Sequence, residues 1–463
     1  MKTQALIFVL GAVTLFGQAK LPPYSRQTLP NGATLIMLRK PDVPLVSVSA
    51  VFRGGSEAVL AEKTGLAAIT AELLRRGTEK RTADQINEQL DGIGAVMNGG
   101  SDAQSSIVSL EFTTRTSAKA LEIFTDILQH PAFPDSEFKK LLAQRIDAVK
   151  SSKDNPARSI AQYFNPFVYP AGHPYARPSM GDETTLANIT RDDVTSFFKK
   201  NYVGKNMILL AAGDFDPAQL GAQLTQIATA LPAGDAFSAP KVAPVQFASG
   251  RLLLIDKPDA TQTYFRIAMP GVDRYSRDRV PLMIINTLFG GRFTSMLNDA
   301  LRVNAGLTYG ANSQVTMDRA PGVIFINTYT RTETTEKAID LALDVLKGLR
   351  EKGISAGQLA SAKAYIKGGF PTQRLETADQ LASVIGELEV FGLSKGEIDD
   401  LFSSIDAVTV ERANTVVKKY FTDTNLQFLL VGNASKIQDA VKKYAPKMKV
   451  VPVSAPGFSA PAF

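Results

Sequence analysis

The stretch that decides the fold is ITRDDVTSFFKKNYVGKNMILLAAGD, residues 189–214, because a related stretch, VTVERANTVVKKYFTDTNLQFLLVGN, fills residues 408–433. Each copy starts with Ile-Thr or Val-Thr, passes through a Lys-Lys pair and an Asn, and ends in an apolar run before Gly. The paired positions, from Thr190 with Thr409 to Gly213 with Gly432, all differ by 219 residues without a gap. Such a constant offset is the mark of an internal repeat.

A second repeated pattern lies upstream of this stretch. Thr114-Arg115-Thr116 precedes one helical pattern and Thr330-Arg331-Thr332 precedes another, with a small insertion. We therefore expect two homologous halves of roughly equal length. The expected divisions are a first half at 20–231, a linker rich in Pro, Ala, Gly and Ser at 232–250, a second half at 251–451 and a flexible tail at 452–463.

Within each half, strand-like and helix-like patterns alternate. In the first half, residues 45–52 form a β-rich run, and Thr64–Arg76 is a candidate helix closed by a glycine. Thr82 and Gln85 have the spacing of a capping box. Residues 108–113 alternate apolar with polar, which predicts a strand with one wet face. We therefore predict an α+β fold in which each half has an antiparallel sheet with helices packed on one face.

Composition narrows the class of protein. Hydrophobic residues at 44% and charged residues at 21% are typical of a folded soluble protein, which excludes a disordered chain. The net charge is +6, but no basic block gathers it, and this disfavours a nucleic-acid binder. The absence of cysteine excludes disulfides and thiolate metal sites. Only two imidazoles are available to any metal, His130 and His173.

The beginning of the chain has the pattern of a secretory signal. Lys2 supplies a positive charge, residues 5–16 are apolar, and Gly17-Gln18-Ala19 presents small residues for cleavage. We expect a signal peptide at 1–19, cleaved after Ala19, with an uncleaved membrane anchor as the alternative. The mature chain is then exported, either to the periplasm or outside the cell.

Several short stretches, in order along both halves, resemble one known family. They are Gly65-Leu66-Ala67, Gly77-Thr78, Asp154-Asn155-Pro156, Gly172-His173-Pro174-Tyr175, Gly290-Gly291-Arg292-Phe293-Thr294-Ser295, Leu301-Arg302 and Gly306-Leu307-Thr308-Tyr309-Gly310. Together they resemble the pitrilysin/insulinase metallopeptidases, especially the two-domain type that includes the mitochondrial processing peptidase subunits. The resemblance covers nearly the whole mature chain and implies that the two halves are arranged as a clamshell.

Active members of that family carry an H-x-x-E-H motif, whose two histidines bind zinc and whose glutamate is the general base. The resemblance places Ala68 at the first histidine, Ala71 at the base, Glu72 at the second histidine, and Ala148 at a distal glutamate ligand. One carboxylate remains where three ligands and a base are required. We therefore expect no metal in this chain, and we interpret Glu72 as a solvated helix residue.

The site is not rebuilt from other residues. His130 lies at an expected helix end, and His173 lies in a Gly-Pro turn, so both are interpreted as structural histidines. No G-x-S-x-G stretch is present to support a serine nucleophile. We therefore do not expect the chain to hydrolyse peptides alone.

The second half retains two residues that match the family's substrate-binding positions. The resemblance implies that Arg302 and Tyr309 donate hydrogen bonds to the backbone of a substrate near its scissile carbonyl. By pattern alone, Arg302 lies in the last turn of a helix at 295–304, where it would also complement the helix dipole, and Tyr309 would open the next strand or simply pack.

Two further stretches allow both a functional and a structural interpretation. Gly290-Gly291 could let backbone approach a bound peptide, or could end a helix. Residues 105–112 resemble the family's peptide-binding edge strand, or form an ordinary strand.

The first hypothesis is a non-catalytic subunit of an exported heterodimeric zinc peptidase, with zinc carried by a homologous partner and with Arg302 and Tyr309 acting on the partner's substrate. The alternative is a peptide-binding or scaffold protein without a proteolytic partner. An autonomous peptidase with a rearranged metal site is the third hypothesis and the weakest, because the ligands are missing.

Overall fold

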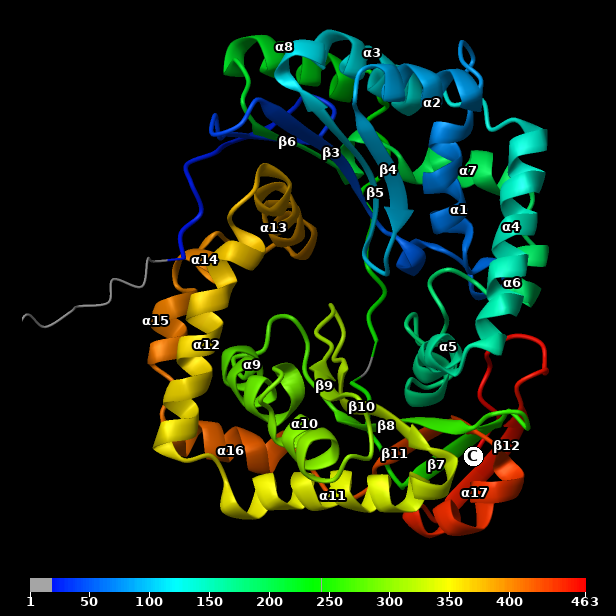
Figure 1. The fold of residues 1–463 in the computed structure, drawn as a ribbon. Coiled ribbons are helices and arrows are strands. Elements are labelled where there is room, and N and C mark those ends of the chain that lie inside the picture. Colours follow the sequence, from blue (N-terminus) through cyan, green and yellow to red (C-terminus); the bar gives the residue numbers. More distant parts are fainter. Residues whose placement is uncertain (1–18, 243) are drawn as a thin grey trace, which may run out of the picture.

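The computed structural model describes residues 19–242 and 244–463, so the predicted signal peptide lies outside the described residues except for Ala19. Two halves face each other, and each contains a six-stranded sheet flanked by helices (Figure 1). The prediction of two α+β halves is confirmed.

The sheet of the first half has the strand order β1-β2-β6-β3-β5-β4. Its strands are β1 (Ser25–Thr28), β2 (Thr34–Arg39), β3 (Leu45–Arg53), β4 (Val96–Ser101), β5 (Ser105–Thr113) and β6 (Met207–Gly213). The sheet of the second half has the order β12-β7-β11-β8-β10-β9. Its strands are β7 (Arg251–Asp256), β8 (Gln262–Pro270), β9 (Ala311–Val315), β10 (Val323–Arg331), β11 (Gln427–Gly432) and β12 (Lys447–Pro452).

Neither sheet is wholly antiparallel, which corrects one detail of the prediction. In the first sheet β2 pairs parallel with β6, and in the second sheet β7 pairs parallel with both β11 and β12. The parallel pairs arise because β6 and β11 return from helical segments to the middle of each sheet. The alternating pattern on β5 gave no sign of them, because both neighbours of β5 are antiparallel to it.

The internal sequence repeat corresponds to equivalent helices and strands in the two halves of the structure. Helix α7 (Arg191–Asn201) is followed by β6, and α16 (Val410–Tyr420) is followed by β11 at the same spacing. The N-cap side chains of these helices, Thr190 and Thr409, each accept a hydrogen bond from a backbone N–H of the first turn. The predicted capping box of Thr82 and Gln85 is also present.

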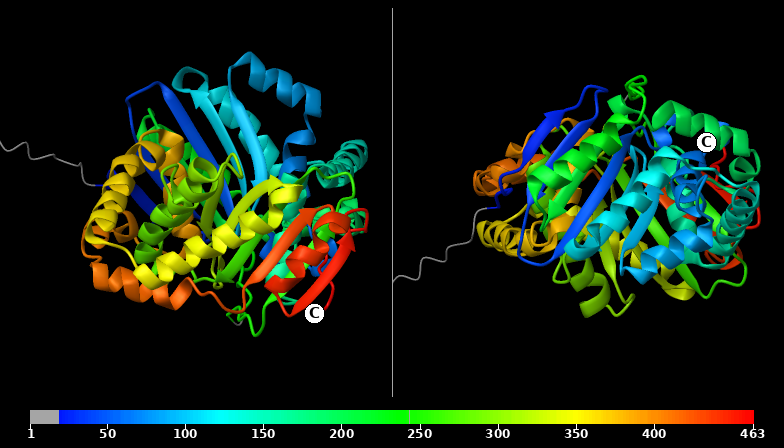
Figure 2. Two further views of the ribbon diagram at one scale, coloured as in Figure 1. Left: turned by 60° about the horizontal axis from the view of Figure 1, so that its bottom comes forward. Right: turned by 90° about the horizontal axis from the view of Figure 1, so that it is seen from above.

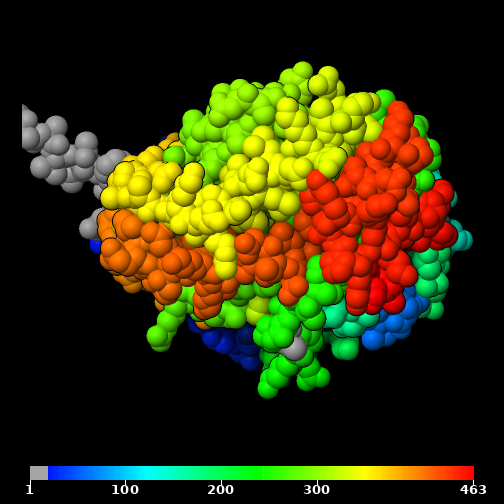
Figure 3. Space-filling view, turned by 90° about the horizontal axis from the view of Figure 1, so that it is seen from below, coloured from blue at the N-terminus to red at the C-terminus, as the bar shows by residue number. Residues whose placement is uncertain are grey.

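Helices cover the outer face of each sheet. Figure 2 shows α3 and α8 over the first sheet, and Figure 3 shows the outer surface that α11, α16 and α17 form on the second half. The helices of the first half are α1 (Leu66–Leu73), α2 (Ala83–Gly92), α3 (Ser117–Gln129), α4 (Asp135–Asp154), α5 (Pro156–Val168), α6 (Glu183–Ala187), α7 and α8 (Pro217–Thr229). Those of the second half are α9 (Arg279–Asn286), α10 (Met296–Asn298), α11 (Thr335–Lys352), α12 (Ala356–Arg374), α13 (Ala378–Phe391), α14 (Gly396–Asp399), α15 (Leu401–Asp406), α16 and α17 (Ala434–Val441), with π-helical turns η6 (Thr287–Gly291) and η7 (Asp299–Asn304).

The inner face of each sheet is covered in part by a helix of the other half. Helix α5 of the first half packs on β8 and β11, and its Phe164 lies against Phe325 of the neighbouring strand β10. Helix α13 of the second half packs on β3 and β6, where Leu381 and Ile385 join Leu210 in one apolar cluster. Because the two helices occupy equivalent places after α4 and α12, the exchange is reciprocal. It ties the halves together through two apolar cores.

The segments expected to be irregular behave differently from each other. Between α8 and β7, the described residues of the linker contain no helix or strand. At the other end of the chain, part of the expected flexible tail is packed instead: Phe458 is fully buried against Tyr163, because α5 presents an apolar surface there. Among residues 19–242 and 244–463, no helix has both the length and the apolar character needed to cross a membrane.

Candidate functional site

The positions that match the zinc motif lie together between α1 and α4. Ala68 and Ala71 are buried on α1, and their methyl groups offer no metal ligand. Glu72, next on the same helix, forms an ion pair with Arg145 of α4. Burial lowers the pKa of Arg145, but its guanidinium stays charged at neutral pH.

This ion pair corrects the interpretation of Glu72 as a solvated residue, since its side chain is only 17% exposed. Arg145 precedes Ala148, the position of the distal ligand, by one helical turn. A guanidinium therefore neutralises the one remaining carboxylate. The residues present do not fit a zinc ion, and the described part of the chain has no group of three His, Cys, Asp or Glu side chains suited to a metal.

The surroundings of Glu72 form a polar pocket of about 480 Å³ whose charges pair with one another. Arg76 pairs with Glu137 of α4 at 3.3 Å, and Arg75 donates to the carbonyl of Met97 on β4 at 3.0 Å. The three arginines around this pocket, Arg75, Arg76 and Arg145, therefore all bond to partners within the chain.

The two histidines have structural surroundings, as predicted. His130 lies at the C-terminal end of α3, where its backbone N–H bonds to Asp126. His173 is buried, its ring stacks on Tyr169, and its Nδ1 accepts a hydrogen bond from the backbone of Tyr175 at 3.1 Å.

The edge-strand interpretation of residues 105–112 is wrong. These residues form β5, which pairs with β3 on one side and β4 on the other, so its main chain has no free side. The edge strand on this side of the sheet is β4. The sequence did not indicate it clearly, because Asn98, Gly99 and Gly100 weaken its strand pattern. Along β4, Gly99 lies so close to Ala71 that a Cβ would meet the Ala71 carbonyl at 2.3 Å.

Arg302 lies on η7, a π-helical turn that replaces the second part of the predicted helix at 295–304. Its guanidinium lies 4.7 Å from the ring centroid of Phe293, a cation–π geometry. Among the described residues, Arg302 has no carboxylate partner, so its charge is available.

Tyr309 lies two residues before β9 and is 80% exposed. The backbone beside it is pinned by threonines of β10: Thr328 Oγ1 donates to the Gly310 carbonyl at 2.9 Å, and Thr330 Oγ1 donates to the Leu307 carbonyl at 2.7 Å. The Tyr309 phenol is therefore exposed on a fixed backbone. The packing alternative for Tyr309 is therefore excluded.

The Gly290-Gly291 turn has a structural explanation. It ends η6, and a Cβ on Gly290 would meet the Ser313 backbone nitrogen at 2.2 Å. Close packing of η6 against β9 therefore requires this glycine, without any bound peptide.

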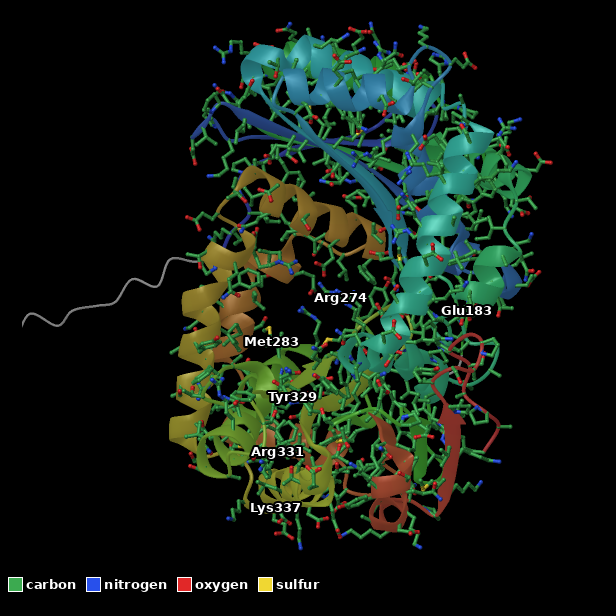
Figure 4. All side chains as sticks on the ribbon, turned by 45° about the vertical axis from the view of Figure 1, so that its right-hand side comes forward. Glu183, Arg274, Met283, Tyr329, Arg331 and Lys337 are labelled. Carbon is green, nitrogen blue, oxygen red and sulfur yellow. The ribbon has the colours of Figure 1, made fainter. Side chains whose placement is uncertain are left out.

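A cavity that the sequence did not reveal lies between the inner face of the first sheet, α13 and the turn joining β9 to β10. Its volume is about 690 Å³. Ser47 and Ser49 of β3 and Ser109 of β5 line it, and Ser109 belongs to the strand face that the sequence predicted to be polar. Beside it, Arg274 pairs with Glu387 of α13 at 3.1 Å (Figure 4).

Three carboxylates, those of Asp318, Glu57 and Asp102, lie near one another at one end of this cavity, where the two halves touch. Asp318, from the β9–β10 turn, accepts a hydrogen bond from Gln104 of the first half at 3.2 Å. Glu57 accepts a hydrogen bond from Tyr175 at 2.6 Å and lies 3.4 Å from Arg319. Burial, together with the charges of Asp102 and Glu57, raises the pKa of Asp318 to about 6. No sequence motif predicts this cluster, because its three carboxylates come from segments that are far apart in the sequence.

This contact predicts a pH-dependent stability. A carboxyl whose pKa is raised in the folded state stabilises the fold when protonated, and this contribution is lost as the pH rises from about 4 to about 6. Asp318→Asn is therefore expected to stabilise the protein by about 1 to 3 kcal/mol at pH 8, and to change little near pH 4. Thermal melting at both pH values measures the difference. Asp439→Asn, at a 93% exposed side chain, is the control and should shift neither melt. A variant destabilised at both pH values would contradict the assignment.

Comparison with known proteins agrees with this architecture. A model of the insulinase family, peptidase family M16, matches residues 34–165, and a model of the peptidase M16 inactive domain matches residues 188–366. An uncharacterized zinc protease of Rickettsia felis is 24% identical over 383 residues, which are 82% of this chain and 91% of the relative. The uncharacterized zinc protease YmxG of Bacillus subtilis is 22% identical over 398 residues, 86% of this chain and 96% of the relative.

Solved structures show the same fold. The peptidase M16 inactive domain from Pseudomonas fluorescens superposes with a TM-score of 0.81 at 24% identity, covering 89% of this chain and 98% of that chain. A protease from Helicobacter pylori gives a TM-score of 0.81 at 20% identity, covering 89% of this chain and all of that chain. The two family models match consecutive parts of the chain, the second running from the end of the first half into the second half, and the fold is shared over both halves, so this chain belongs to peptidase family M16, the insulinase family.

Proposed function

We propose that this chain is the non-catalytic subunit of an exported zinc peptidase and presents Arg302 and Tyr309 to the substrate of a homologous, zinc-bearing partner. The observation that carries the proposal is the contrast between the halves. In the first half, Arg145 neutralises Glu72 where a metal would need ligands. In the second half, Tyr309 stands exposed on a pinned backbone and Arg302 keeps an unpaired charge.

The chemistry of this pair follows from its donors. A guanidinium and a phenol can both donate hydrogen bonds to a carbonyl oxygen, and such bonds strengthen as that oxygen gains negative charge. Neither group is a nucleophile here, and neither supplies the water that hydrolysis needs. The pair therefore stabilises a reaction whose metal and base belong to the other chain.

The proposal is tested by isolating the native complex from its source and then mixing the purified chains. The expected partner carries H-x-x-E-H, and the mixture is expected to cleave an unfolded fluorogenic peptide faster than the partner alone, in a chelator-sensitive manner. This chain alone should show no cleavage. If no zinc-bearing homologue co-purifies and mixing the chains adds no activity, the proposal that this chain is a non-catalytic subunit is rejected.

The alternative is a peptide-binding or scaffold protein without a proteolytic partner. The serine-lined cavity favours it, because that cavity lies wholly within this chain. Under this alternative, peptides would bind the isolated chain, and no zinc-bearing homologue would accompany it.

A further inference from the structure

Exposed apolar side chains gather around Arg302 on the second half. Phe293 is 63% exposed, Val303 60% and Tyr365, on α12, 51%. Large exposed apolar groups that lie together mark interaction sites more often than scattered ones do. We call this surface the arginine–aromatic face and define it by Arg292, Phe293, Arg302, Val303 and Tyr365.

Contacts between its members make the face continuous. The Arg302 guanidinium lies over the Phe293 ring, and that of Arg292 lies 5.8 Å from the ring centroid of Tyr365. Arg292 also donates to Ser361 of α12 at 3.0 Å, which fixes its position. Each arginine thus rests against a ring that is itself more than half exposed.

The charges of this face are not balanced within the chain. Among the described residues, neither Arg292 nor Arg302 pairs with a carboxylate. Between α1 and α4 of the first half, in contrast, Arg76 pairs with Glu137 and Arg145 pairs with Glu72. The guanidiniums of Arg292 and Arg302 are therefore free to pair with a carboxylate from outside the chain.

Main-chain pairing cannot be the mode of contact at this face. Strand β9 is the edge of the second sheet, but two asparagines occupy its outer side. Asn298 accepts a hydrogen bond from the Ala311 N–H at 3.3 Å, and Asn286 donates to the Ser313 carbonyl at 3.2 Å. A segment bound beside β9 would therefore be held by its side chains.

From this arrangement we propose that the arginine–aromatic face binds a peptide segment that carries a carboxylate side chain next to apolar side chains. The guanidiniums pair with the carboxylate, and the rings of Phe293 and Tyr365 contact the apolar groups. The proposal rests on the proposed function in one respect: it specifies which peptides the Arg302 and Tyr309 half-site receives.

The test measures binding by the isolated full chain. The probe is a fluorescein-labelled unfolded peptide in which Glu, Leu and Gly alternate, compared with the same peptide carrying Gln or Lys in place of Glu. We expect the Glu peptide to bind roughly tenfold more tightly than the Gln peptide, with affinity that falls as salt is added. Arg292→Gln and Phe293→Ala should each remove most of this preference. Thermal melting of Phe293→Ala should stay unchanged because that side chain is 63% exposed, which separates loss of binding from loss of folding.

Arg331→Gln is the matched control, because it removes the same charge at the exposed end of β10, outside the face (Figure 4). A loss of preference as large in Arg331→Gln as in Arg292→Gln would show that only the overall positive charge attracts the peptide, and would overturn the proposal. Equal affinity for the Glu and Gln peptides would also overturn it. Because no partner is present in this assay, either failure leaves the result of the mixing experiment unaffected.

Discussion

In a complex with its zinc-bearing partner, Arg302→Ala is expected to lower kcat/KM by a factor of about 10² to 10³, and Tyr309→Phe by a similar factor. Each change removes one donor aimed at a carbonyl oxygen that becomes negative in the transition state. Removal of such a donor typically costs about 3 kcal/mol of barrier stabilisation. Steady-state hydrolysis of an unfolded peptide by the mixed chains measures the effect.

The structure makes this experiment specific. The Tyr309 side chain is 80% exposed, so the loss of its hydroxyl leaves the fold of this chain intact. Arg302 contacts the exposed ring of Phe293, so its removal should also cost little stability. Co-elution and melting of both variants verify assembly. Variants that assemble normally and cleave at the unaltered rate would show that the pair is structural.

The second large effect concerns zinc itself. The natural chain is expected to bind no stoichiometric zinc, because methyl groups and a neutralised carboxylate occupy the four motif positions. The variant Ala68→His, Ala71→Glu, Glu72→His, Ala148→Glu, combined with Arg145→Ala, is expected to bind one zinc per chain. Histidines four residues apart share a helix face, and α4 lies beside α1 to supply the distal ligand.

Retaining Arg145 in that variant provides the matched control. A guanidinium beside a divalent cation opposes binding, so the affinity should fall by at least about tenfold. Elemental analysis and competition with a chromogenic chelator measure both variants. One tightly held zinc in the natural chain, or a folded rebuilt variant that ignores zinc, would show that these positions do not correspond to the family's metal site.

Local features were predictable because local residues cause them. The capping box at Thr82 and Gln85 depends on side chains that reach their own helix. The repeat offset fixes equivalent helices and strands because each unit must bury the same apolar faces. The polar face of β5 followed from alternation, and in the structure it lines the cavity.

The errors arose where a neighbour in space decides the outcome. Residues 105–112 have the pattern of a half-buried strand, and no local signal tells whether β4 will cover one edge. Glu72 has the pattern of a solvated helix residue until Arg145, from another helix, pairs with it. The cluster of Asp318 and Glu57 joins segments from both halves, so only the fold creates it.

By itself, the sequence determined that this protein has two related α+β halves and contains no H-x-x-E-H motif, because repeats and motifs are properties of the chain alone. Only the tertiary structure decided that α5 and α13 exchange sheets, since an apolar helix face does not specify which surface it covers. It also decided that Arg302 keeps an unpaired charge while Arg145 does not, because the pairing of charges depends on which side chains the folded chain brings within contact distance.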